Sequence, residues 1–371
     1  MSQSIDSRAQ PLADRLRDRI KQAGPITFHD WMQAALYDEH DGYYRRPDRV
    51  QQGRTGDYRT APETSPLFGA TFANYFAKSH LDLGRPVSWT IFEIGAGRGD
   101  FAHAVLTTLQ TSCPDVFQAT RFLIDEIGDE ARHAVEQKVS GFSDRVEFRS
   151  MAQVTAPFVG IIFSNELVDA FPVHRVIGGS DGLRELYVDV NQAGDFVWTR
   201  GDLDPGVAGF CEQIDLQLAE GQVYEVNLAA EDFIGRAASL IDRGLLVTVD
   251  YGAQRADLLN APHRNAGTLR AFHRHRMIED VLSQPGEQDL TTTVDWTQMT
   301  EAGDRHGLEV LRLQRLDQFL LIEDLLGQLM NVSEPAADAA EIVRLRAGAR
   351  ELIMPDALAA YFQVMVQRKT S

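Results

Sequence analysis

The sequence predicts an α/β protein built around a doubly wound, mostly parallel sheet. From residue 87 onwards, short apolar runs alternate with segments of helical periodicity, the pattern of successive strand–helix units. The first run, Val87–Ile94, ends in a Gly-x-Gly-x-Gly turn at residues 95–99, before a predicted helix over 101–109. A strand that turns through glycines into a helix brings backbone N–H groups close to a ligand. The 371 residues, 44% of them hydrophobic, suffice for a full core.

Seven runs are predicted as strands of this sheet. The run Val159–Phe163 is uninterrupted and apolar, which is typical of a parallel strand buried on both faces. Because parallel sheets bind ligands beyond the carboxyl ends of their strands, we expect the glycine turn, Glu126 and Asn165-Glu166 at one ligand-binding edge. The predicted strands span 87–93, 121–125, 145–148, 158–164, 245–251, 308–313 and 361–366, with a helix over 229–242 before the fifth.

Helices are predicted ahead of the sheet. Leucine and isoleucine recur at helical spacing over residues 11–22, and Gly24-Pro25 ends that helix. Thr27 is the expected N-cap of a second helix within 26–36, and a third helix is expected over 68–80. Between them, residues 56–69 contain two prolines, two glycines and several hydroxyls, which predicts a structured loop and not a helix.

Two insertions interrupt the alternation. Residues 184–199 alternate around a polar, glycine-containing turn and predict a hairpin, and residues 263–295 are expected to form a loop over the ligand end of the sheet. These features divide the chain into four parts. They are an N-terminal helical cap with a lid loop (1–85), the first half of the sheet (86–176), an inserted hairpin subdomain (177–225), and the second half with an inserted loop at 260–295 (226–371).

The chain is acidic, with 54 Asp and Glu against 36 Lys and Arg and a formal charge of -18. This charge repels phosphate backbones and anionic lipid, so we expect no nucleic-acid partner, although solubility alone also explains it. The two cysteines, Cys113 and Cys211, exclude a disulfide framework or a cysteine zinc site. No apolar run reaches membrane-spanning length, and residues 1–24 lack an apolar signal core. We therefore expect a cytoplasmic protein without membrane insertion.

Five motifs in the chain resemble those of a known family. Together they are similar to the MidA family of S-adenosylmethionine-dependent methyltransferases, which includes the mitochondrial complex I assembly methyltransferase, and the match runs from about Ile26 to the C-terminus. The motifs are 56–63 (GDYRTAPE), 93–99 (EIGAGRG), 164–174 (SNELVDAFPVH), 267–270 (GTLR) and 285–291 (PGEQDLT). The resemblance implies the Rossmann-like, seven-stranded class I methyltransferase fold with a helical cap and an inserted hairpin. It also implies S-adenosyl-L-methionine as cofactor and N-methylation of a protein arginine, of which symmetric dimethylation is one form.

The cofactor site is expected at the glycine turn. Gly95, Gly97 and Gly99 would make room for the methionine and ribose portions. Glu93, two residues before the turn, could receive the ammonium. Glu126 is expected to accept the ribose hydroxyls.

Three further parts of the cofactor site are less determined. Asp125 is the alternative to Glu126, because a slip of one residue exchanges the two faces of a strand. Phe148 or Met151 could supply a flat slot for adenine, although core packing is the simpler role for each. Residues 56–63 would form a lid over the cofactor, with Asp57, Thr60 and Glu63 as its contacts. The alternative is that they form only a well-capped structural loop.

Asn165, Glu166 and Asp169 are the expected catalytic residues, because they follow a very apolar strand at the ligand end. Carboxylates hold a guanidinium in fork geometry and take up a proton as the methyl group arrives, so Glu166 is the first choice for the substrate clamp and Asp169 the second. The competing interpretation is a helix-capping Asn followed by acids in the first turn. No metal site is expected, because His273 and His275 have no third ligand at a suitable spacing.

Two other functions fit the same motifs. A methyltransferase acting on oxygen or nitrogen of a small molecule would have an enclosed apolar pocket. A cofactor-binding assembly factor would show little catalysis. The expected partner is a protein substrate with an exposed arginine, and the apolar hairpin could pair two copies of the chain into a homodimer.

Overall fold

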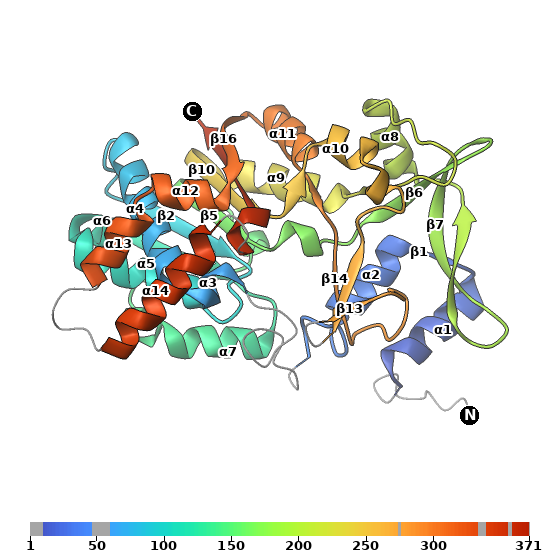
Figure 1. Ribbon diagram of the computed structural model, residues 1–371, viewed down its shortest axis with the longest axis horizontal. Helices are drawn as coiled ribbons and strands as arrows, with labels where there is room; N and C mark the ends of the chain where they lie inside the picture. Colours follow the sequence, from blue (N-terminus) through green and yellow to red (C-terminus); the bar gives the residue numbers. More distant parts are fainter. Residues whose placement is uncertain (1–9, 47–59, 274–275, 333–338, 355–357, 371) are drawn as a thin grey trace. The chain divides into compact units, whose positions relative to one another are not determined.

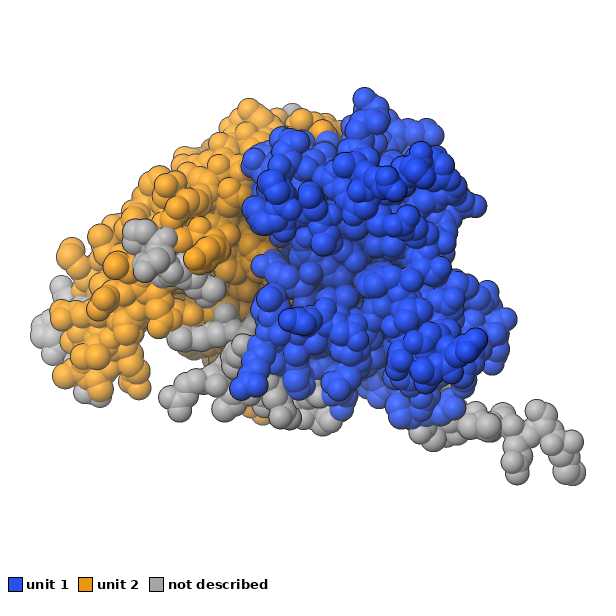
Figure 2. All heavy atoms as spheres, turned by 45° about the vertical axis from the view of Figure 1, so that its right-hand side comes forward, with its two compact units in different colours: residues 1–51, 168–232, 253–297 blue, residues 52–167, 233–252, 298–371 orange. Residues whose placement is uncertain are grey.

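The computed structural model describes residues 10–46, 60–273, 276–332, 339–354 and 358–370. The chain forms two compact units, each assembled from three separate segments and coloured separately in Figure 2. Unit 1 comprises residues 1–51, 168–232 and 253–297, and unit 2 comprises residues 52–167, 233–252 and 298–371. Within the described ranges, none of the helices combines the length and the apolar character that crossing a membrane requires.

Unit 2 is built on a seven-stranded sheet of order β16-β17-β10-β5-β2-β3-β4 (Figure 1). Neighbours from β4 to β10 are parallel, and β17 runs antiparallel to both β10 and β16. The strands are β2 Trp89–Ile94, β3 Thr120–Asp125, β4 Val146–Phe148, β5 Phe158–Asn165, β10 Ile241–Asp250, β16 Leu308–Arg315 and β17 Gln363–Lys369. The prediction of a seven-stranded doubly wound sheet is confirmed, and β10 begins four residues earlier than predicted, at Ile241 rather than Leu245.

Helices cover both faces of this sheet. On one face, the ring of Phe163 from β5 stacks on Phe101 of α5 with centroids 4.0 Å apart. The helices that share this core are α4 Pro66–Asp82, α5 Asp100–Ser112, α6 Pro114–Ala119, α7 Asp129–Lys138, α12 Leu316–Ile322, α13 Leu325–Val332 and α14 Ala339–Ile353. On the other face lie α9 Leu228–Leu240 and α11 Trp296–Arg305, and Gln367 Nε2 of β17 donates to the Met299 carbonyl of α11 at 3.2 Å.

The predicted N-terminal helices are present, with one exception in detail. These are α1 Leu12–Ala23 and α2 Phe28–Tyr37, whose cap Thr27 accepts a hydrogen bond from Asp30 N at 3.1 Å. Ile26–Thr27 is not helical but forms the short strand β1. The loop prediction for 56–69 is wrong over its second half, because α3 spans Ala61–Thr64 and α4 starts at Pro66. Proline is favoured at the first positions of a helix, where its missing N–H has no partner to lose. Residues 56–59 lie outside the described ranges.

Unit 1 contains a five-stranded antiparallel sheet. The predicted hairpin is confirmed as β7 Gly182–Val190 and β8 Phe196–Gly201 (Figure 1), closed by Asn191 N donating to the Asp195 carbonyl at 3.0 Å. The hairpin does not stand alone, because β7 also pairs with β1 and with β6 His174–Gly179, which in turn pairs with β9 Val223–Val226. β6 and β9 were not predicted from the sequence.

The prediction of a loop over 263–295 is wrong in part. This segment holds a three-stranded sheet, with β12 Arg270–His273 between β13 Arg276–Ile278 and β14 Asp289–Thr291. Strands of three or four residues are too short to show periodicity. The remaining short elements are α8 Pro205–Gln213, β11 Gly252–Ala253, α10 Arg255–Asn260 and β15 Val294–Asp295.

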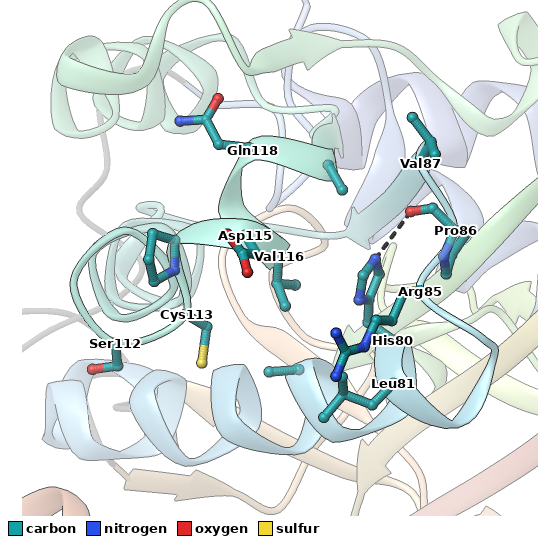
Figure 3. A pocket seen from close by; sticks show the side chains of 13 residues that line it. His80, Leu81, Arg85, Pro86, Val87, Ser112, Cys113, Asp115, Val116 and Gln118 are labelled. Carbon is teal, nitrogen blue, oxygen red and sulfur yellow. Dashed lines mark hydrogen bonds between the residues drawn. The ribbon is translucent and has the colours of Figure 1, made fainter.

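Unit 2 also has a cavity of about 570 Å³ at the amino-terminal edge of its sheet (Figure 3). Its walls come from the end of α4, residues 85–87 before β2, and the start of α6. His80 Nε2 donates to the Pro86 carbonyl there at 3.0 Å. This cavity lies at the opposite end of the strands from the glycine turn and is not part of the site described next.

Candidate active site

Acidic or amide side chains end four neighbouring parallel strands of unit 2. Glu93 is the next-to-last residue of β2, Asp125 the last of β3, Asn165 the last of β5 and Asp250 the last of β10. Because these strands run in one direction, their carboxyl ends meet at one edge of the sheet. This edge is rich in carboxyl groups, which can bind the hydrogen-bond donors of a positively charged ligand.

The turn after β2 has the conformation that its glycines predict. Gly95, Gly97 and Gly99 have φ values of 74°, 55° and 78°, in the region that other residues rarely adopt. A Cβ atom at Gly99 would also lie 3.0 Å from Val135 Cγ1, so a side chain there would require Val135 to shift. The 13-residue helix α5 begins directly after the turn, at Asp100, and its first N–H groups are available to a ligand.

Glu126 and Asp125 have different surroundings. Glu126 Oε2 accepts a hydrogen bond from Gly97 N, and Oε1 accepts one from Gly128 N, both at 2.9 Å. Asp125 Oδ2 instead accepts from Met151 N at 2.7 Å, in the segment after β4. Burial raises the pKa of both carboxyls. Of these two alternatives, Glu126 is the acid whose side chain contacts the glycine turn.

Glu93 is a fully buried acid beside the turn. It is 3% exposed, and its Oε2 has no hydrogen-bond partner among the described residues. Burial, and then the nearby carboxylates Glu126 and Asp100, raise the pKa of Glu93 to about 8. An unsatisfied buried carboxyl is costly, so this oxygen is a place where a ligand donor would be stabilising.

The raised pKa of Glu93 predicts a specific dependence of stability on pH. The folded protein keeps this proton up to about pH 8, whereas the unfolded chain releases it near the ordinary glutamate pKa of 4.5. Between these values the folded state binds more protons, so the free energy of unfolding falls as the pH rises. Glu93→Gln should remove this loss and gain at least about 1.4 kcal/mol relative to wild type between about pH 5 and pH 9.

Denaturant unfolding of both proteins at the two pH values measures this difference. Glu130→Gln, at an exposed position of α7, is the control and should follow wild type. If the free energy of unfolding changes with pH equally in wild type and Glu93→Gln, the pKa of Glu93 is not raised in the folded protein.

Two of the three predicted lid contacts can be located. Thr60 N donates to Glu63 Oε2 at 3.3 Å, which is part of the capping box of α3. Asp57 lies outside the described residues. The other carboxyl oxygen, Glu63 Oε1, is buried and has no described hydrogen-bond partner. Burial is the main cause of the raised pKa of Glu63; Asp100 raises it further and Arg98 lowers it. Glu63 therefore lies within electrostatic range of the glycine turn.

The two residues predicted for an adenine slot are half-buried. Phe148 packs against the core, and the guanidinium carbon of Arg132 lies 4.9 Å from its ring centroid. Met151 begins a short 3-10 turn, and its backbone N–H binds Asp125. Core packing thus accounts for Phe148 at least in part.

Asn165 and Glu166 form a sharp turn at the end of β5. Glu166 has a φ of 50°, which costs a non-glycine residue on the order of 1 kcal/mol. Its N–H donates to the Val249 carbonyl at 2.9 Å, and its Oε1 accepts from Asn165 Nδ2 at 3.0 Å. Asn165 Oδ1 is buried without a described hydrogen-bond partner. Backbone strain of this kind is concentrated at functional sites.

Asp169, the third predicted catalytic residue, belongs to unit 1, whereas Asn165 and Glu166 belong to unit 2. Asp169 is 5% exposed, and its Oδ2 accepts from Thr291 Oγ1 at 2.7 Å. Its carbonyl accepts from Thr292 N at 2.9 Å. The last residue of the 285–291 motif therefore holds Asp169 in place.

Within unit 1, two tyrosines bind segments next to Asp169 and Thr291. Tyr37 donates its hydroxyl to the Ala170 carbonyl at 3.0 Å, and Tyr44 donates to Asp289 Oδ1 at 2.7 Å. The sequence analysis missed both tyrosines, because nothing in their spacing relates them to residues more than 100 positions away. Asp250 was also missed, although the rule about strand ends that selected Glu126 applies to it.

Of the two histidines considered as metal ligands, only His273 lies in the described structure. His273 Nδ1 donates to the Glu287 carbonyl at 2.8 Å, and His275 lies outside the described residues. Across the described ranges, no group of three or more His, Cys, Asp or Glu side chains is placed to hold a metal ion.

Comparison with known proteins identifies the family. A family model described as "Putative S-adenosyl-L-methionine-dependent methyltransferase" matches residues 71–314. A crystal structure of a "likely methyl transferase" from Burkholderia thailandensis bound to S-adenosyl-homocysteine superposes with a TM-score of 0.85 at 29% identity, covering 96% of this chain and 92% of that one. The mitochondrial protein arginine methyltransferase NDUFAF7 homolog of Drosophila melanogaster is 26% identical over 89% of this chain and 80% of its own length. The human protein arginine methyltransferase NDUFAF7 is 23% identical over 80% and 69%.

These comparisons agree with the sheet order and with the glycine turn at its ligand edge. The fold is that of a class I methyltransferase, and S-adenosyl-L-methionine is the cofactor. The chain belongs to the family of S-adenosyl-L-methionine-dependent methyltransferases.

Proposed function

We propose that this protein transfers a methyl group from S-adenosyl-L-methionine to a guanidinium nitrogen of an arginine in a protein substrate. The observation that carries the proposal is Glu166, a carboxylate on a strained left-handed turn at the ligand edge, with Asn165 bound to it. Relatives that share about a quarter of the sequence are named protein arginine methyltransferases, which supports the same acceptor.

The residues of unit 2 fit the cofactor. The unsatisfied buried Oε2 of Glu93 suits an ammonium group, and Glu126, already at the glycine turn, is placed for ribose hydroxyls. Asp57, Thr60 and Glu63 are proposed as further contacts. When bound, the cofactor supplies an electrophilic methyl group on a positively charged sulfur.

Glu166 is proposed to hold and activate the guanidinium. That group is a poor nucleophile because its nitrogen lone pairs are delocalised. A carboxylate that binds one side draws positive charge toward itself and leaves another nitrogen more able to attack. The nitrogen lone pair then forms the N–C bond, the electrons of the C–S bond return to sulfur, and the surplus nitrogen proton passes to the carboxylate.

Two further residues of the 164–174 motif are proposed to assist. Asn165 fixes the direction of the Glu166 carboxylate through its Nδ2 hydrogen bond. Asp169 is retained as a second candidate carboxylate, because Thr291 and Thr292 hold it rigidly within unit 1. Alignment of the acceptor and exclusion of water are expected to contribute most of the rate.

The acidic surface supports a basic protein segment as the substrate, since opposite charges steer association. The two cysteines, neither of them in a disulfide, support a reducing compartment such as the cytoplasm as the place of reaction.

The test is to incubate the protein with S-adenosyl-L-methionine labelled in its methyl group and a lysate of its own source. The label should appear in a protein band and, after digestion and mass spectrometry, on an arginine side chain with one or two added methyl groups. A reaction without the protein is the control. Label confined to small metabolites would replace the proposal with a small-molecule methyltransferase, and no transfer despite cofactor binding would indicate an assembly factor.

A further inference from the structure

We propose that Asp250 is a positioning residue that fixes the turn carrying Glu166. Asp250 ends β10, the strand beside β5, and is fully buried. The register pairs its neighbour Val249 with Asn165, so the two strand ends lie side by side. The inference rests on the proposed role of Glu166 and adds the group that sets its position.

Two consecutive N–H groups attach the turn to the end of β10. Glu166 N donates to the Val249 carbonyl at 2.9 Å, and Leu167 N donates to Asp250 Oδ2 at 3.3 Å. The second of these bonds depends on a side chain, and it lies directly after the residue with positive φ. Removing it would let Glu166 relax toward an ordinary backbone conformation and move its carboxylate.

The same turn packs against the cofactor-binding turn. A Cβ atom built on Gly95 would lie 3.2 Å from Leu167 Cδ1, so the side chain of Leu167 lies against that glycine. Leu167 is therefore held through its N–H by Asp250 and through its side chain by the glycine turn. By holding Leu167, Asp250 fixes the position of the adjacent Glu166 next to the glycine turn.

A carboxylate suits this position better than an amide. Oδ1 of Asp250 accepts from Tyr251 N at 2.9 Å while Oδ2 accepts from Leu167 N. Asparagine has the same shape but one acceptor oxygen, so its NH2 group would face one of these two N–H groups. Asp250→Asn should therefore loosen the turn without creating a cavity.

The experiment compares full-length wild type, Asp250→Asn and Asp317→Asn, titrated with S-adenosyl-L-methionine for affinity and saturated with it for exchange and kinetics. Asp317 is a buried aspartate of α12 in the same unit, bound to Arg315, and serves as the matched control. Calorimetry gives cofactor affinity, hydrogen exchange reports on residues 165–168, and methyl transfer gives kcat and KM. Asp250→Asn should speed exchange at 165–168, lower kcat about 30-fold at nearly unchanged KM, and leave cofactor affinity within about 3-fold.

Three results would overturn the inference. They are unchanged exchange at 165–168, an unchanged kcat, or equal losses in Asp317→Asn, which would mean general destabilisation. A wild-type protein that methylates no arginine would overturn the proposed function instead. In that case, exchange at 165–168 together with intact cofactor binding still decides whether Asp250 holds the turn.

Discussion

Gly97→Leu is expected to weaken S-adenosyl-L-methionine binding by at least about 1,000-fold, a loss of about 4 kcal/mol, while the protein stays folded. Gly97 lies in the middle of the turn, has a φ of 55° that side-chain-bearing residues rarely adopt, and is half-buried. Its N–H also fixes Glu126 at 2.9 Å. The substitution therefore fills the space where the backbone should meet the ligand and disturbs the proposed ribose acceptor. Calorimetry measures the affinity.

Gly84→Leu is the matched control for backbone strain. Gly84 is also in unit 2, has a φ of 84°, and has no atom within 4 Å of a Cβ atom built on it. Both variants should lose similar stability, on the order of 1–2 kcal/mol, in thermal unfolding. If Gly84→Leu also loses the cofactor, or Gly97→Leu keeps it, the glycine turn is not the binding site.

The centre of the unit 2 sheet could be predicted because β2, β5 and β10 are largely buried apolar runs. Ile161, Ile162 and Phe163 of β5 are fully buried. A continuous apolar run of this length is typical of a parallel strand that is buried on both faces. The glycine turn adds a local conformational requirement that is readable from residue type alone. Unit 1 is harder to predict, because only its β7–β8 hairpin shows a clear alternation and its sheet joins β1, at residue 26, to β7, at residue 188.

The part of the candidate site that could be located from the sequence is the set of polar residues at the ends of predicted strands. Glu93, Glu126, Asn165 and Glu166 all lie at the edge that the strand order implies. Glu126 was preferred over Asp125 from the sequence, and the structure adds that its carboxylate contacts Gly97; apolar patterning alone does not resolve which of two consecutive residues faces the turn. Contacts such as Thr291 with Asp169, 122 residues apart, depend on tertiary packing that no local pattern encodes.

Glu166→Gln is expected to lower kcat for methyl transfer about 1,000-fold and to leave cofactor affinity nearly unchanged. The amide keeps the size of the side chain and can still accept a hydrogen bond. The neutral amide cannot attract the positive charge of the guanidinium, and it cannot take up the proton that the attacking nitrogen loses. Steady-state kinetics with an arginine-containing acceptor, together with calorimetry for the cofactor, measure the two effects separately.

Asp324→Asn is the matched control for this variant, because Asp324 is likewise an acidic residue of unit 2 with positive φ, at 74°, in an exposed turn between α12 and α13. It should retain wild-type kinetics. If Glu166→Gln raises only KM, Glu166 contributes equally to substrate binding in the ground state and the transition state, and the proton must go elsewhere. If kcat and KM both stay at wild-type values, the carboxylate has no part in the transfer, and Asp169→Asn becomes the variant that decides whether any acid of the 164–174 motif does.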